Sequence, residues 1–216
     1  MIKIIFSFVM FIFCASVVLS YDKKLDQYIP IFDRPRVIDK TYYITVYNPD
    51  RTIKFVAWVL IYDRSIIGQG ERSGMTFPWA VRRNFVGSNL DIGHLCPAQD
   101  MAWLLEAMQS TFDVDNQVPQ TKRFNRGLCR SLETQCRKWA LNGQDFVIMT
   151  GPLYRAKPST TIGIDKISVP THCWKLVINL FTRETLGYIF PNTPDVSGVP
   201  VMFKIDPATI KKEVGL

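Results

Sequence analysis

The length and composition of the chain are those of one folded globular domain. Its 216 residues are 47% hydrophobic and 21% charged, a mixture that excludes a coiled coil and an intrinsically disordered chain. The formal net charge of +7 favours a polyanionic partner, because each neutralised phosphate releases condensed counterions, but charge alone does not identify that partner.

Residues 1–20 predict a signal peptide. Lys3 supplies a positive start, residues 4–19 carry no charged side chain, and Ser20 offers a small residue for cleavage. The apolar run barely reaches the roughly 17 to 25 residues that a spanning helix needs, so an uncleaved signal anchor is the weaker alternative. We therefore predict a secreted protein with one domain at 21–216, no stable membrane association after cleavage, and no indication of its oligomeric state.

Four cysteines follow the predicted signal peptide. An even number of cysteines in an exported chain indicates two disulfides, with three possible pairings. The pairing of Cys129 with Cys136 is disfavoured, because seven helical residues separate their Cα atoms by roughly 10 Å, beyond the about 7 Å that a disulfide tolerates. The other two cysteines are Cys96 and Cys173.

The N-terminal third predicts a β-hairpin. Residues 41–47 and 54–62 are rich in Tyr, Ile, Val, Phe and Trp, and the Asn-Pro-Asp-Arg stretch at 48–51 has the chemistry of a turn. A polar, glycine-containing loop is expected at 68–74.

The middle and the end of the chain predict helices and further strands. Residues 98–109 and 122–141 carry apolar side chains at helical spacing, the second with an interruption at Gly127. A third helix is expected to begin at Asp206-Pro207. The expected strands are 146–149, 174–181 and 185–190. The result is an α+β domain whose central antiparallel sheet is flanked by helices.

One of the two histidines lies in an unusual segment. Gly93 permits a tight backbone path before His94, and Pro97 ends the extended segment ahead of the predicted helix. The imidazole is therefore expected at a strand end, where it faces the side chains of the next helix. Taken alone, this segment fits a histidine held by ordinary structural hydrogen bonds.

The residues that follow favour a different interpretation, because the string from Leu90 to Arg137 resembles the DNA/RNA non-specific endonuclease family, whose active site is a ββα-metal motif. The family pattern is Asp-Arg-Gly-His with a nearby Pro, then Asn-x-x-Pro-Gln, then Asn followed eight residues later by Glu and four further by Arg. Several separated elements in the right order make the resemblance specific. The matching positions here are Asp91, Gly93, His94, Pro97, Asn116, Pro119, Gln120, Asn125, Glu133 and Arg137.

The resemblance implies a general base and a metal ligand. His94 would take a proton from the water that attacks phosphorus, since imidazole has an ordinary pKa of about 6.5 and is largely neutral at working pH. Asn125 would be the one direct protein ligand of Mg²⁺, with Mn²⁺ as a substitute, because this ion prefers oxygen and gives up water reluctantly. The ion would stabilise charge on the phosphate and polarise a water that protonates the leaving 3′ oxygen.

The resemblance also implies three supporting residues. Glu133 would accept hydrogen bonds from metal-bound water, Arg137 would clamp a phosphate, and Asn116 would orient His94 or the substrate. The alternative for Glu133 and Arg137 is a surface ion pair across one helical turn, a common feature that contributes only about 0.2–0.5 kcal/mol. The reproduced family spacing favours the functional interpretation.

One position departs from the family pattern. Ile92 stands where the family usually has an arginine before Gly-His, so a positive charge near the scissile phosphate is missing from its expected place. Arg72, Arg82 and Arg83 lie upstream, where the family places another phosphate-contacting arginine, and Arg72 is our candidate for substrate binding.

Together these observations predict a secreted, Mg²⁺-dependent endonuclease that cleaves DNA and RNA with little sequence preference and leaves 5′-phosphate ends. Broad specificity follows if the contacts go to phosphates and sugars, which carry no direct base information. One alternative is a phosphodiesterase that acts on small nucleotide esters. The other is a nucleic-acid-binding protein that has lost catalysis, and the missing arginine at Ile92 is the only sequence feature that favours it.

Overall fold

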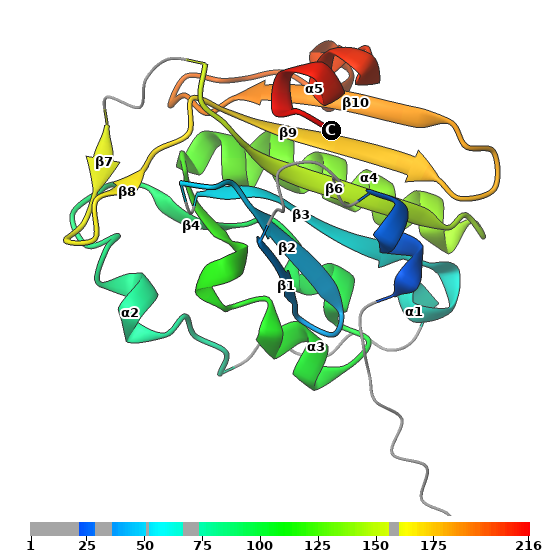
Figure 1. Cartoon of the computed structure of the whole chain (residues 1–216), viewed down its shortest axis with the longest axis horizontal. Helices are drawn as coiled ribbons and strands as arrows, with labels where there is room; N and C mark the ends of the chain where they lie inside the picture. The colour runs from blue at the N-terminus through cyan, green and yellow to red at the C-terminus, as the bar shows by residue number, and fades with distance from the viewer. Residues whose placement is uncertain (1–21, 29–35, 51, 67–73, 156–159) are drawn as a thin grey trace, which may run out of the picture.

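A seven-stranded antiparallel sheet forms the centre of the protein in the computed structural model (Figure 1). The residues that the structure describes are 22–28, 36–50, 52–66, 74–155 and 160–216. The predicted signal peptide, most of the predicted loop at 68–74 and Arg72 lie outside these ranges. In spatial order the strands are β1 (Arg36–Asp39), β2 (Tyr43–Tyr47), β3 (Ile53–Leu60), β6 (Phe146–Leu153), β9 (His172–Asn179), β10 (Thr185–Pro191) and β11 (Lys204–Ile205).

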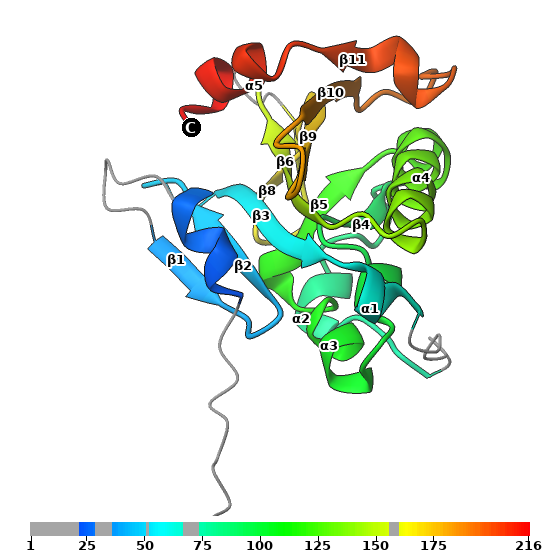
Figure 2. The ribbon, with the colours of Figure 1, turned by 90° about the vertical axis from the view of Figure 1, so that its right-hand side faces the viewer.

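The two faces of this sheet bury separate apolar clusters, because successive side chains of a strand point to opposite sides. On β3, Trp58 belongs to the cluster beneath the long helix α4 (Arg130–Leu141), which contributes Leu132. Phe55 belongs to the opposite cluster, beneath the N-terminal 3-10 helix η1 (Lys23–Tyr28) and α5 (Pro207–Val214). Figure 2 shows α4 on one side of the sheet and η1 and α5 on the other. The predicted α+β class is confirmed.

A second, two-stranded sheet begins the functional region. β4 (Asp91–His94) pairs antiparallel with β5 (Gln117–Gln120). The chain then enters a helix that starts as a π-helical segment, η4 (Phe124–Cys129), and continues without a break as α4. Two strands and a helix in this order form the ββα arrangement that the sequence predicts.

Most of the predicted elements are present. The hairpin is formed by β2 and β3, which pair antiparallel. The strand expected at 146–149 runs further, to Leu153, because all eight residues of β6 are buried. At the third predicted helix, the side chain of Asp206 accepts a hydrogen bond from the Ala208 amide at 2.9 Å, as expected of a helix cap.

The single helix predicted at 98–109 is wrong. The structure has a 3-10 helix, η2 (Ala98–Met101), and a separate α-helix, α3 (Leu105–Ser110), joined through Leu104 in an extended conformation. Trp103 lies at the break, where its ring packs edge-to-face against Tyr42 with centroids 5.7 Å apart. This tertiary contact outweighs the helical preference of the segment.

The two predicted disulfides are also wrong, because all four cysteines that follow the predicted signal peptide are free thiols in the structure. They are buried in the same apolar cluster between α4 and the sheet, where each packs as a small apolar side chain. Two of them also make polar contacts: Cys129 donates to Glu133, and Cys173 accepts from Gln120.

Short elements complete the described part of the chain, and no helix in that part is long and apolar enough to cross a membrane. The remaining elements are α1 (Tyr62–Ile66), α2 (Trp79–Arg82), η3 (Val114–Asn116), β7 (Thr161–Ile162), β8 (Ile167–Ser168) and η5 (Pro200–Phe203).

Candidate active site

A cleft of about 940 Å³ lies against the ββα motif. Its lining comes from β4, from η2, from one side of the continuous helix η4–α4, and from the residues around α2. The predicted site residues His94, Asn125, Glu133 and Arg137 all line this cleft, although up to 43 residues separate them along the chain. The fold therefore brings together most of the residues selected by the family pattern.

His94 is the last residue of β4 and is held between aromatic rings. Its imidazole packs against Phe77 and Phe112, with ring centroids 5.1 and 5.0 Å away. A larger residue before it would displace Gln120, because a Cβ at Gly93 would lie 2.2 Å from the side-chain Cδ of Gln120 on the paired strand. These contacts restrict the imidazole to one region of the cleft wall.

Asn116 forms hydrogen bonds with the backbone that follows His94. Its side chain is fully buried, accepts from the Cys96 amide at 2.7 Å, and donates to the carbonyl oxygens of Cys96 and Thr111 at 2.9 and 2.8 Å. A contact between Asn116 and the substrate, one of the two roles predicted from the sequence, does not fit this buried position. Asn116 instead holds the loop in which β4 ends.

Asn125 is oriented by Asp91. The Asn125 side-chain nitrogen donates to Asp91 Oδ2 at 3.0 Å. Because a carboxylate only accepts hydrogen bonds, the nitrogen must face Asp91, and the carbonyl oxygen of Asn125 is turned away from it. Arg126 binds the same carboxylate through two hydrogen bonds, at 2.8 and 2.7 Å. Burial raises the pKa of Asp91, but the hydrogen bonds from Arg126 and Asn125 outweigh burial and hold that pKa below its usual value.

The π-helical segment brings Asn125 and Glu133 to the same side of the helix. In a regular α-helix, eight residues rotate through two turns and roughly 80° more. The wider turns of η4 reduce this remaining rotation, and both side chains line the cleft.

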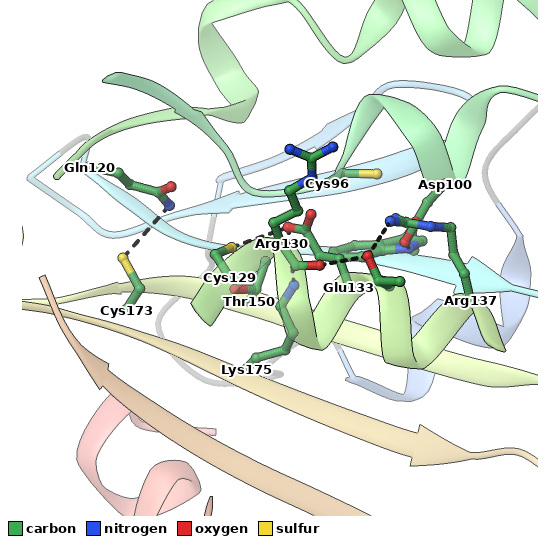
Figure 3. A network of polar contacts seen from close by, with 12 residues as sticks. Cys96, Asp100, Gln120, Cys129, Arg130, Glu133, Arg137, Thr150, Cys173 and Lys175 are labelled. Atoms are coloured by element: carbon green, nitrogen blue, oxygen red, sulfur yellow. Dashed lines mark hydrogen bonds and ion pairs between the residues drawn. The ribbon is translucent and has the colours of Figure 1, made fainter. Parts of the chain in front are cut away.

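Glu133 is a partly buried carboxylate with two contacts on one oxygen (Figure 3). Oε1 accepts from the Cys129 thiol at 3.1 Å and lies 3.7 Å from the ammonium of Lys175, while 14% of the side chain is exposed. Burial raises the pKa of Glu133 above its usual value, although the positive charge of Lys175 acts in the opposite direction. Lys175 was not predicted as a site residue from the sequence. The available signal was a lone lysine inside the otherwise apolar strand Trp174–Ile178.

Arg137 pairs with Asp100 and not with Glu133, the partner that the surface ion-pair alternative requires. Its guanidinium binds Asp100 at 2.7 Å and donates to Thr134 at 3.2 Å. The second oxygen of Asp100 accepts from the Trp58 indole at 3.1 Å. In the described part of the chain, Glu133 pairs with Lys175, so an i,i+4 ion pair between Glu133 and Arg137 is not observed.

Arginines supply the positive charge of the cleft. Ile92 shares a face of β4 with His94 and lines the cleft, so an arginine there would point into it. Of the upstream candidates that the structure describes, Arg82 lines the cleft, whereas Arg83 binds Asp165 beside β8 at 3.0 and 3.2 Å. Arg126 and Arg130 add further charge from the helix.

The oxygen donors beside the ββα motif fit a hard cation better than a soft one. Within the described ranges there is no group of three or more His, Cys, Asp or Glu residues placed to hold a metal ion. What the cleft offers is the amide oxygen of Asn125, with the carboxylate of Glu133 on the same side of the helix. One protein oxygen and room for water is the kind of site that Mg²⁺ accepts.

Comparisons with known proteins point in the same direction. A family model described as DNA/RNA non-specific endonuclease matches residues 26–202. The mitochondrial endonuclease G of Bos taurus is 28% identical over 198 residues, covering 81% of this chain and 66% of its own length. A nuclease of Nostoc sp. is 30% identical over 158 residues, covering 68% of this chain and 56% of its own length. The chain thus spans less than two thirds of these relatives.

A solved structure shares the fold. A chain in a crystal structure of the EndoG/EndoGI complex superimposes with a TM-score of 0.75 at 22% sequence identity, covering 90% of this chain and 89% of that chain.

Proposed function

Because the chain belongs to the DNA/RNA non-specific endonuclease family, we propose that it is a secreted, Mg²⁺-dependent endonuclease that hydrolyses phosphodiester bonds of DNA and RNA with little sequence preference. The observation that carries the proposal is the common cleft, in which a histidine, an oriented asparagine and several arginines meet at a ββα motif. Secretion rests on the predicted signal peptide, and broad specificity rests on recognition through phosphates.

Each side chain of the cleft has a separate role in the proposed reaction. His94, restrained by its aromatic neighbours, accepts the proton of the attacking water. Asn125 would hold Mg²⁺ through the oxygen that faces away from Asp91, and the ion would supply electrostatic stabilisation of the phosphate. Glu133 orients water at this position by accepting hydrogen bonds, and Arg137, fixed by Asp100, contacts a phosphate oxygen.

A cleavage assay with and without chelator tests the proposal. The purified mature chain is mixed with plasmid DNA, with RNA and with a small phosphodiester such as bis(p-nitrophenyl) phosphate. We expect cleavage of both polymers, its loss in excess chelator and its return when Mg²⁺ is added. Full activity in excess chelator would contradict the metal dependence. Turnover of the small ester without cleavage of the polymers would favour a phosphodiesterase, and binding of the polymers without cleavage would favour a non-catalytic binding protein.

We further predict that Arg82 supplies the charge that is missing at position 92. Arg82→Ala should lower the cleavage rate at least tenfold, since a charge-assisted hydrogen bond contributes about 1.5–3 kcal/mol. Ile92→Arg should be neutral or harmful, because the added guanidinium would compete with one already present. Single-turnover rates on plasmid DNA measure both effects.

Arg83→Ala is the matched control, since Arg83 is adjacent in sequence but binds Asp165. It should cleave at nearly the wild-type rate. If Ile92→Arg speeds cleavage severalfold while Arg82→Ala stays near the wild-type rate, the charge is simply absent and the prediction is wrong.

A further inference from the structure

Lys175 is a charged side chain at the centre of the protein, with no part in the roles assigned above. It lies on β9 and is only 3% exposed, although the lysine ammonium is strongly hydrated in water. A buried ammonium is costly unless a negative group lies beside it, and such a group is present. Glu133 Oε1 is 3.7 Å from the Lys175 nitrogen.

The contact joins a strand of the sheet to the helix that lines the cleft. Lys175 extends from β9 toward the carboxylate that Glu133 carries on α4 (Figure 3). Cys129 donates to the same oxygen, so both contacts are made to Oε1. Glu133 also lines the cleft. Its carboxylate is therefore held at the core and presented to the site that Asn125 and His94 share.

Lys175 also completes a balanced group of charges. Its ammonium lies 5.6 Å from the centre of the Trp58 ring, and the indole of Trp58 donates to Asp100, the partner of Arg137. Two cations thus balance two anions in one cluster, in which Lys175 and Asp100 are buried and Glu133 and Arg137 are partly exposed. Removing one of them would leave an uncompensated charge in a medium that solvates it poorly.

We propose that Lys175 is a positioning residue of the active site, which keeps Glu133 ionised and turned toward the cleft. The inference rests on the proposed function, because it assigns Lys175 a role in the same reaction. A purely structural ion pair would have the same geometry, so the test must separate the two roles.

The pH dependence of catalysis gives that separation. The charged groups around Glu133 are Lys175 from β9, Asp100 from η2 and Arg137 from α4, with the thiols of Cys129 and Cys136 also nearby. Burial and Asp100 raise the pKa of Glu133, whereas Lys175 and Arg137 lower it. In Lys175→Met the pKa of Glu133 must rise, so Glu133 becomes protonated at higher pH and activity is lost sooner on acidification.

The first experiment therefore measures kcat against pH at saturating Mg²⁺. Lys175→Met should lose about ten- to a hundredfold in kcat, the usual effect of removing a group that orients a metal site, and its acid limb should move to higher pH. Lys175→Arg restores the charge and should move the limb back. Lys54→Met is the control, since Lys54 also lies on a sheet strand but donates to a backbone carbonyl, that of Gly215. Protonation of the His94 base also contributes to the acid limb, so a folded Lys175→Met that keeps both the wild-type kcat and the wild-type acid limb would overturn the proposal.

A second experiment needs no catalysis and covers a variant that fails to fold. Urea denaturation of the metal-free protein compares Lys175→Met with Glu133→Gln and with the double variant. If Lys175 compensates the charge of Glu133, the double variant should be more stable than Lys175→Met alone, because glutamine needs no cation. A double variant as unstable as Lys175→Met would show that Lys175 only packs, and would overturn the proposal. If the wild type cleaves nothing, the proposed function fails separately, while this coupling is still measured.

Discussion

Replacing His94 with alanine is expected to lower the rate of nucleic-acid cleavage by about 10² to 10⁴, the usual contribution of general base catalysis. The imidazole lines the cleft beside Asn125 and the arginines, so its loss should remove proton transfer while leaving the phosphate contacts in place. Single-turnover cleavage should fall, whereas binding of a labelled oligonucleotide, measured by fluorescence anisotropy in chelator, should be nearly unchanged. That binding should weaken as salt rises, because phosphate contacts release counterions.

His172 provides a matched control for this variant. It is the second histidine of the chain, it begins β9, and its Nδ1 lies 3.0 Å from the hydroxyl of Thr171. His172→Ala should cleave at nearly the wild-type rate. A normal rate in His94→Ala together with a large loss in His172→Ala would move the general base to His172.

Replacing Asn125 with alanine is expected to abolish most cleavage, by at least about a hundredfold, because several kcal/mol of charge stabilisation depend on the ion that this residue would hold. Some activity should return at higher Mg²⁺ concentration if the loss is one of metal affinity. The measurement is the initial rate on plasmid DNA as a function of Mg²⁺ concentration.

Two further variants sharpen the assignment of Asn125. Asn125→Asp keeps an oxygen ligand but sets a second carboxylate against Asp91, about 3 Å away, where like charges repel and one of the two must take up a proton. We therefore expect Asn125→Asp to be impaired as well. Asn142→Ala, at the other end of the same helix, serves as the control and should keep the wild-type Mg²⁺ dependence. A wild-type rate in Asn125→Ala would exclude this residue as the metal ligand.

Local patterns were sufficient to predict the elements that hold the site. The β2–β3 hairpin follows from β-branched and aromatic runs around a turn, and β6, β9 and β10 follow from apolar runs of the right length, whereas β1 and β11 were not predicted. The resemblance to the endonuclease pattern selected His94, Asn125 and Glu133, and the fold brings these residues to one cleft. The hairpin and the individual strands depend on residues that lie close together in one element or in adjacent elements.

Prediction failed where a long-range contact decided the outcome. The helix expected at 98–109 is divided because Trp103 packs on Tyr42, more than 60 residues away in the chain. The cysteines were expected to pair from their even number and an exported context. In the structure they fill a core beside Lys175 and Glu133 as free thiols.

The sequence by itself determined which residue types enter the cleft, since the ββα pattern prescribes a histidine, an asparagine and a glutamate at fixed intervals. Only the tertiary structure decided the partner of each side chain. Arg137 binds Asp100 rather than Glu133, Asp91 orients Asn125, and Lys175 pairs with Glu133 across the core. The physical reason is that an ion pair or a hydrogen bond depends on distances of a few ångströms between side chains from different elements, and sheet order and helix packing set those distances.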